Sequence, residues 1–163
     1  MKGRKKYFLQ LLWAAIWLLP FTAQGQLSVY TFEQIDSLQK VAPRNAVVFI
    51  HTDWCNFCQS MKNTTFKNKD LTKVLNQSFW FADLNAEEER DINFHHQTFK
   101  FRPTGRSTGV HELAEQLGTK EVKLSYPAIC VLNEEYEIVF QYDQFLSADQ
   151  LLTALQVILD REQ

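Results

Sequence analysis

The sequence is poor in the residues that mark unusual architectures: its 163 residues include five glycines, four prolines and three cysteines. So little glycine and proline excludes a collagen-like or low-complexity disordered chain. The odd number of cysteines (Cys55, Cys58 and Cys130) excludes a set of disulfides that is complete within one chain. With 45% hydrophobic and 22% charged residues, the composition is that of an ordinary globular domain with a packed core.

An apolar run as long as the roughly 20 residues of a membrane-spanning helix is also missing. The nearest approach is residues 7–21, which follow a basic start at residues 2–6 and lead into the small residues of "TAQGQ". A basic region, a short apolar core and a small-residue exit are the three parts of a secretory signal. We therefore predict a signal peptide over residues 1–25 and a periplasmic or secreted protein, with an uncleaved N-terminal anchor as the alternative.

Positive charge is scarce in the rest of the chain. Residues 26–163 hold 13 basic and 19 acidic residues, a net charge of −6. This balance argues against binding to nucleic acid, and against stable binding to an anionic membrane after signal cleavage. Export also sets the redox context, because two close cysteines outside the cytosol can form a disulfide that persists.

Residues 26–163 show no internal repeat or linker, and so predict one domain. Helical patterns fall at 31–42, 55–62, 68–77, 110–118 and from 147 onward, and strand patterns at 46–52, 79–85, 127–133 and 136–142. The first and last helices open with capping boxes, and Gly118 is the expected C-terminal cap of the fourth. The first two strands predict a parallel βαβ unit and the last two a hairpin. The predicted fold class is α/β, a central mixed sheet flanked by helices.

The segment 86–108 has no clear place in this pattern. It is charged at first and then alternates apolar and polar residues around Phe94, Phe99 and Phe101. We interpret it as an inserted loop or small hairpin.

The pair Cys55 and Cys58 lies where a buried strand ends and a helix begins, in "FIHTDWCNFCQSM". The helix N-terminus would stabilise a thiolate at Cys55, and Cys58 would lie below it on the same helical face. That layout suits a two-step exchange, in which Cys55 attacks a disulfide and Cys58 resolves the mixed disulfide. A structural staple is a weaker alternative, because so short a loop restricts little unfolded-chain entropy.

A metal site is the other alternative for the pair. Zinc needs four ligands, and the sequence has no second C-x-x-C motif. Histidines 51, 95, 96 and 111 are available, but the adjacent His95 and His96 would point to opposite faces of a strand and fit a polar loop better. We therefore expect no metal and no cofactor beyond the cysteine pair itself.

"WCNFC" after a buried strand, together with "SYPAICVLN" before a hairpin and a last helix, resembles the thioredoxin superfamily. The resemblance covers nearly all of residues 26–163 in element order, and is closest to bacterial extracytoplasmic thioredoxin-like proteins. It implies a three-layer fold with the 86–108 insertion lying before the cis-proline strand.

The resemblance also implies roles for individual residues. Cys55 would be the exposed nucleophile and Cys58 the buried resolving thiol. Pro127 would be a cis-proline facing the pair, Tyr126 would offer backbone groups to a substrate, and Trp54 would flank the site. The intervening Asn56 and Phe57 would face the substrate and tune the redox potential.

Two positions depart from the family pattern. Many thioredoxins carry a buried acid six residues before the first cysteine, where this chain has Phe49. Asp83 on the next strand could assist proton transfer instead, although a surface acid at a strand end is the simpler interpretation. Cys130 falls in a core strand and is expected to serve packing.

The function that these residues predict is an exported thiol–disulfide oxidoreductase, a protein disulfide reductase rather than an oxidase or isomerase. Its partners would be protein thiols and disulfides and an upstream electron donor. The rivals are a non-enzymatic binding module that holds a partner or a metal through the cysteines, and a structural protein with a permanent bridge. We further expect Phe94, Phe99 and Phe101 to shape a wall near the active site and to bias partner choice.

Overall fold

The computed structural model describes residues 25–106, 108–120 and 123–161. The predicted signal peptide therefore lies, apart from its last residue, outside the described residues. None of the helices in the described part of the chain is long and apolar enough to cross a membrane.

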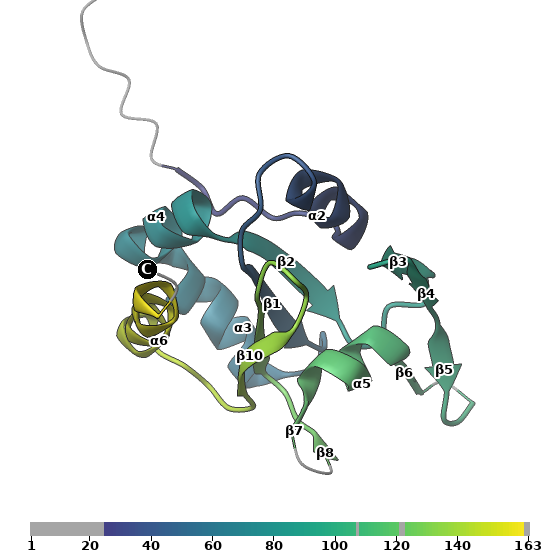
Figure 1. The fold of residues 1–163 in the computed structure, drawn as a ribbon. Coiled ribbons are helices and arrows are strands. Elements are labelled where there is room, and N and C mark those ends of the chain that lie inside the picture. Colours follow the sequence, from purple (N-terminus) through teal and green to yellow (C-terminus); the bar gives the residue numbers. More distant parts are fainter. Residues whose placement is uncertain (1–24, 107, 121–122, 162–163) are drawn as a thin grey trace, which may run out of the picture.

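The core of the fold is a four-stranded mixed sheet in the order β10-β9-β1-β2 (Figure 1). The bounds are β1 Ala46–His51, β2 Trp80–Asn85, β9 Ala128–Leu132 and β10 Ile138–Tyr142. Strands β1 and β2 run parallel, whereas β9 is antiparallel to both β1 and β10. The predicted βαβ unit and closing hairpin are confirmed, and so is the mixed sheet.

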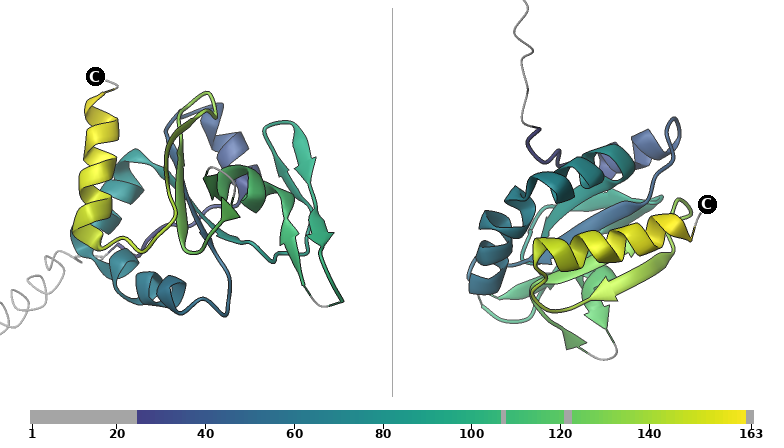
Figure 2. Two further views of the ribbon diagram at one scale, coloured as in Figure 1. Left: turned by 90° about the horizontal axis from the view of Figure 1, so that it is seen from below. Right: turned by 90° about the vertical axis from the view of Figure 1, so that its left-hand side faces the viewer.

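Helices cover both faces of this sheet. Helices α2 (Phe32–Gln39) and α5 (Glu112–Gly118) pack on one face, and α3 (Asn56–Asn63), α4 (Lys69–Ser78) and α6 (Ala148–Asp160) on the other. The left view of Figure 2 shows these layers side by side. The sequence of β1 explains them, because every residue of the strand is buried and successive side chains enter opposite cores. Val48 and Ile50 belong to the α2/α5 core, and Val47 and Phe49 to the α3/α4/α6 core.

Side-chain caps fix most of the helix starts where the sequence predicts them. Thr31 and Ser147 form capping boxes with Gln34 and Gln150, and Asn68 accepts two backbone N–H groups at the start of α4. The predicted cap at Gly118 is wrong. Gly118 is the last residue of α5, and an added Cβ would lie 2.5 Å from a Leu124 methyl and 3.0 Å from one of Ile50. The glycine is needed for close packing of α5 on the sheet.

Residues 86–111, which we call the hairpin segment, form two hairpins rather than one loop or hairpin. The first pairs β3 (Ile92–Phe94) with β4 (Gln97–Phe99), and the second pairs β5 (Phe101–Pro103) with β6 (Gly109–His111). A further pair, β7 (Thr119–Lys120) with β8 (Lys123–Leu124), was not predicted.

The expectation that Phe94 and Phe99 form a wall near the active site is wrong. Both rings are 4% exposed and pack in the α2/α5 core, where Phe94 meets Phe32 edge to face. Alternation along each short strand turns these rings inward, so they anchor the hairpin to the domain. Only Phe101 keeps a partly exposed position.

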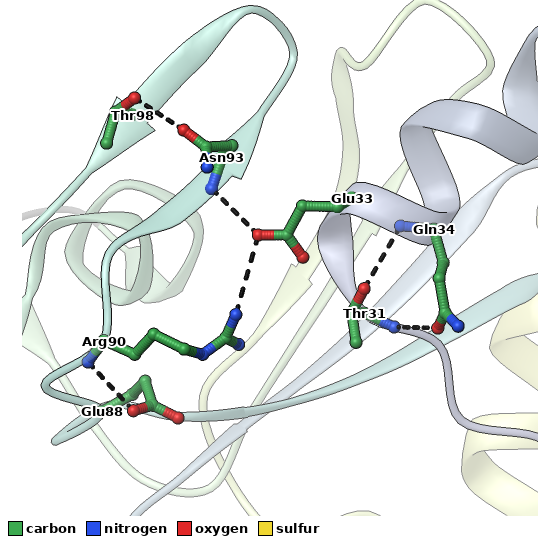
Figure 3. A network of polar contacts seen from close by, with 7 residues as sticks. All are labelled: Thr31, Glu33, Gln34, Glu88, Arg90, Asn93 and Thr98. Atoms are coloured by element: carbon green, nitrogen blue, oxygen red, sulfur yellow. Dashed lines mark hydrogen bonds and ion pairs between the residues drawn. The ribbon is translucent and has the colours of Figure 1, made fainter.

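Polar contacts tie the hairpin segment to the start of α2 (Figure 3). The Glu33 carboxylate accepts the Asn93 backbone N–H at 3.1 Å and lies 3.8 Å from the Arg90 guanidinium. Burial raises the pKa of Glu33, but hydrogen bonds from its own backbone, from the Asn93 backbone and from the Thr31 side chain, with the Arg90 charge, outweigh it and the net pKa is lowered. The hairpin segment is therefore held on the α2 side of the sheet, opposite α3, α4 and α6.

Candidate functional site

Cys55 and Cys58 are joined by a disulfide at the N-terminus of α3. Strand β1 ends at His51, and the Cys55 backbone N–H donates to the Thr52 carbonyl at 3.3 Å, which closes the turn into the helix. Cys55 is the N-cap of α3, and its sulfur accepts the Cys58 backbone N–H at 3.1 Å. This first turn of the helix therefore directs an N–H group and the positive end of the helix dipole at the Cys55 sulfur.

This environment gives the two sulfurs different properties. Cys58 is fully buried, whereas Cys55 is 6% exposed. The expected exposed nucleophile is thus more enclosed than the resemblance implies. Cys55 is nevertheless the member that touches solvent, and N–H donors there stabilise a thiolate.

Large aromatic side chains surround the pair. Trp54 and Phe57 are 66% and 67% exposed, which is unusual for residues of this size. The Trp54 ring meets the Tyr126 ring edge to face at 5.9 Å, and its Nε1 donates to the Glu87 carboxylate at 3.1 Å. Glu87 belongs to the hairpin segment, so that segment helps to orient the exposed indole.

The loop before β9 completes the surroundings of the pair. The Tyr126–Pro127 peptide bond is cis, Pro127 is buried, and Tyr126 packs against the apolar cluster that contains both cysteines. Burial, with the Glu87 charge, raises the pKa of Tyr126 to about 12, so its hydroxyl stays neutral. Asn56 is exposed beside the pair.

Phe49, six residues before Cys55, is 1% exposed and packs in the same apolar cluster as the cysteines. Asp83 lies beside it, because the parallel register pairs these two residues directly. The carboxylate does not stand alone: its oxygens lie 2.5 Å from His51 Nε2 and 3.1 Å from Lys62 Nζ. His51, Asp83 and Lys62 come from β1, β2 and α3, and we call them the polar triad.

The charges of the triad determine the state of Asp83. Burial raises the pKa of Asp83, but the hydrogen bond and charge of His51, followed by those of Lys62, outweigh it and the net pKa is lowered. A carboxylate held in its ionised form is a weak proton acceptor near neutral pH. The structure thus groups Asp83 with two other residues, and proton transfer by Asp83 alone is not what this geometry favours.

A cavity of about 540 Å³ opens beside the triad. Its floor includes Phe49, Phe66 and Phe81, and Lys62 and Asp83 line its wall. The cavity therefore gives solvent a path to Lys62 and Asp83 of the triad, next to the apolar cluster that contains the cysteines.

Sequence reasoning missed His51 and Lys62 as parts of the site, and also Glu87. His51 shares the strand phase of Phe49, and Lys62 follows Cys58 by one helical turn, so each spacing was a usable signal. The missing information was the register of β1 on β2, which is a long-range property.

The other histidines do not form a metal site. Among the described residues, no group of three or more His, Cys, Asp or Glu side chains is arranged to hold a metal ion. His95 and His96 occupy the turn of the first hairpin with φ of 47° and 63°. His111 is fully buried and caps α5, its Nδ1 accepting the Leu113 N–H at 3.2 Å.

A C-x-x-C disulfide at a helix N-terminus and a cis-proline before β9, on a mixed sheet covered by helices on both faces, define a thioredoxin-fold protein. Residues 32–158 match the family described as thioredoxin-like domain, and the chain belongs to this family. Among curated proteins, none matches the sequence significantly.

Solved structures support the same fold. A thioredoxin from Thermus thermophilus is 17% identical with a TM-score of 0.59, and the match covers 83% of this chain and 88% of that one. A thioredoxin-fold protein from Helicobacter pylori is 14% identical with a TM-score of 0.58, covering 86% and 81%. The DsbH oxidoreductase is 12% identical with a TM-score of 0.57, covering 83% and 86%.

Proposed function

We propose that this protein is an exported thiol–disulfide oxidoreductase that reduces disulfides of other proteins. The observation that carries the proposal is the bridge between Cys55 and Cys58 at the start of α3, with the Cys58 N–H on the Cys55 sulfur. A strained or permanent staple has no need of N–H donors aimed at its sulfur, whereas a nucleophilic thiolate does.

In the proposed cycle, the Cys55 thiolate attacks a disulfide of the substrate. One substrate sulfur leaves as a thiolate, and the other stays bound to Cys55 as a mixed disulfide. The Cys58 thiolate then attacks Cys55, which releases the second substrate thiolate and forms the Cys55–Cys58 bridge. Two electrons pass from the protein to the substrate, and an upstream donor of electrons restores the dithiol.

The surroundings of the pair support an extended protein substrate. Trp54 and Phe57 expose large apolar surfaces on either side of Cys55 in the sequence. The Tyr126 backbone, next to the buried cis-Pro127, would pair with a substrate strand, and Asn56 would contact its polar groups. Exposed aromatic surfaces of this kind contribute affinity without demanding one particular sequence.

The reductive direction and the exported location are supported by the sequence. The predicted signal peptide would send the protein out of the cytosol, to where disulfides persist unless something reduces them. The oxidases and isomerases of the thioredoxin superfamily carry Pro-His or Gly-His between their two cysteines. This chain has Asn56–Phe57 there, which favours the reductive direction.

The reduction potential of the pair tests this proposal. The mature protein is equilibrated with dithiothreitol or glutathione buffers, and its free thiols are trapped and counted. A reduction potential of about −270 mV supports a reductant, whereas one of about −120 mV would make the protein an oxidant. If the cysteine pair does not change between dithiol and disulfide, or holds a tightly bound metal after purification, the proposed enzymatic function is contradicted and a binding module is favoured.

The hairpin segment contributes to partner choice in this proposal. A cavity of about 860 Å³ is lined by Asp53, which is next to Trp54, by Glu87, and by Phe101 of the second hairpin. Removing residues 101–109 should change the exchange rates with protein disulfides and leave those with small disulfides unaltered. Equal rates toward all protein substrates would contradict this role.

A further inference from the structure

The polar triad lies on the sheet face that α3 covers. Alternation along β1 and β2 points Phe49, His51 and Asp83 to that face, and Phe49 packs there in one cluster with Cys58. Lys62 follows Cys58 by four residues on α3, so both lie on the same side of the helix. The His51 ring also stacks on Phe49, with centroids 5.4 Å apart. The triad therefore borders the apolar cluster that encloses the resolving sulfur.

The contacts of His51 Nε2 fix where its proton sits. Nε2 lies 2.5 Å from an Asp83 oxygen and 2.9 Å from Lys62 Nζ. A carboxylate only accepts and an ammonium only donates, so Nε2 cannot satisfy both. The shorter contact places a proton on Nε2, and the lysine is then held by the other Asp83 oxygen at 3.1 Å.

The consequence falls on the second ring nitrogen. With the proton on Nε2, Nδ1 of a neutral His51 carries a lone pair. Nδ1 is buried and has no hydrogen-bond partner within the described part of the chain. A buried acceptor without a donor is costly, which makes it a candidate for a functional role. Of the described charged groups, Asp83 from β2 and Lys62 from α3 are the ones in contact with the ring.

The exchange cycle needs such an acceptor. Cys58 is fully buried, and burial in apolar surroundings favours the neutral thiol over the thiolate. Phe49 cannot accept a proton, and Asp83 is held in its ionised form by its two partners. His51 is the remaining side chain of this cluster with a free lone pair, on Nδ1, that can accept the thiol proton.

Building on the proposed function, we propose that His51, oriented by Asp83, accepts the proton of the Cys58 thiol when the mixed disulfide is resolved. The S–H proton of Cys58 passes to Nδ1, directly or through one water, and the ring becomes an imidazolium paired with Asp83. The Cys58 thiolate then attacks the Cys55 sulfur, and the bond between Cys55 and the substrate sulfur breaks. The imidazolium returns its proton to solvent through the cavity beside Asp83.

The test isolates the resolving step with a chromogenic aromatic disulfide, 5,5′-dithiobis(2-nitrobenzoate). The reduced mature protein is mixed with this reagent in a stopped-flow instrument from pH 5.5 to 9.5. Attack by Cys55 releases one coloured thiolate, and resolution by Cys58 releases the second. The ratio of the second rate to the first therefore reports the step that needs His51.

His51→Gln should slow the second phase by about a hundredfold at pH 7, the lower end of what a general base contributes. The defect should shrink as pH rises, because hydroxide then removes the thiol proton, and added imidazole should restore part of the rate. His111→Gln is the matched control, since it also removes a fully buried histidine, but one at the end of β6 that caps α5 and has no contact with the triad. Its ratio of rates should equal that of the wild type.

A second variant keeps the test decisive if His51→Gln does not fold. Asp83 is about one third exposed, so Asp83→Asn should fold, and it should slow the second phase several-fold with the same recovery at high pH. A wild-type ratio and pH profile in the folded variant would overturn the role of the triad. That result differs from failure of the proposed function, in which the wild-type protein would itself release no second thiolate.

Discussion

Cys130 and the Cys55–Cys58 pair lie in the same domain and have opposite surroundings. Cys130 sits in the middle of β9, is fully buried, and is free of any disulfide. Burial raises the pKa of its thiol to about 12, so it stays neutral and unreactive. Cys55 instead caps a helix, receives an N–H bond and lies among exposed aromatic rings.

The difference shows that position, rather than residue type, decides what a cysteine does in this fold. A strand centre offers a sulfur only apolar neighbours and backbone groups that are already paired across the sheet. A helix start offers unpaired N–H groups and a path to solvent. The experiments below test this contrast from the largest expected effect to the smallest.

Loss of the nucleophile should have the largest effect. Cys55→Ser should reduce disulfide exchange to the rate seen without protein, because a serine hydroxyl is not ionised at neutral pH. Cys130→Ala should keep the wild-type rate and lose about 1 kcal/mol of stability from the small cavity. Insulin reduction by dithiothreitol measures the activity, and urea unfolding measures the stability. Wild-type activity in Cys55→Ser would remove the distinction between the two kinds of cysteine.

Thiol accessibility should differ by orders of magnitude between the two environments. In the reduced protein, iodoacetamide should modify Cys55 within minutes at pH 7, whereas Cys130 should react only as fast as the domain opens. Mass spectrometry of peptides after timed labelling gives both rates. Rapid labelling of Cys130 in the folded protein would mean that β9 is far less protected than its full burial indicates.

The polar triad should make the free energy of unfolding depend on pH, because it contains a charged carboxylate, whereas the thiol of Cys130 stays neutral. Burial raises the pKa of Asp83, but His51 and Lys62 hold it below its ordinary value of 3.8. The folded state therefore gains stability from the ionised carboxylate above that value, and loses it as the pH falls through the lowered folded-state pKa.

Asp83→Asn should remove this contribution. Its deficit in the free energy of unfolding should stay below about 1 kcal/mol at pH 7, since the carboxylate is partly solvated. The deficit should shrink as the pH falls below 3.8, toward the lowered pKa of the folded state. Urea unfolding of both proteins from pH 3 to 7 measures it, and a deficit that is constant with pH would show that the charge is not responsible.

The smallest effect is expected at Glu87, which orients Trp54. Glu87→Gln keeps a hydrogen-bond acceptor for the indole but removes its charge, so the exchange rate with a protein disulfide should fall by about twofold to fivefold, the loss expected when one charge-assisted hydrogen bond is replaced by a neutral one. Glu89→Gln, a nearby exposed residue of the same segment, is the matched control. Equal exchange rates for both variants would show that the Glu87 contact with Trp54 does not affect activity.

The sequence was informative where signals are local. The capping boxes at Thr31 and Ser147 and the Asn68 cap placed three helices to within a few residues. The position of Cys55 at a strand-to-helix junction was likewise predicted, because a buried apolar run followed by a polar helix is visible in the residues themselves.

Prediction failed where distant segments meet. The pairing of Phe49 with Asp83 depends on strand register, so His51 and Lys62 could not be recognised as partners of that carboxylate. The phenylalanines of the hairpin segment alternate in the sequence in the same way whether they face a substrate or a core. Phe94 lies in the core because its ring packs against Phe32 of α2, a residue about sixty positions earlier in the sequence.

The register of strand β1 determines the composition of both cores of the protein. Its six residues build one core with their even-numbered side chains, and with their odd-numbered ones they build the other core and place His51 beside Phe49 and Asp83. A shift of β1 by one residue would exchange the two sets completely. It would send Phe49 and His51 toward α2 and α5, and turn Val48 and Ile50 toward α3, α4 and α6. Insertions or deletions within residues 46–51 should therefore be the least tolerated changes in the chain.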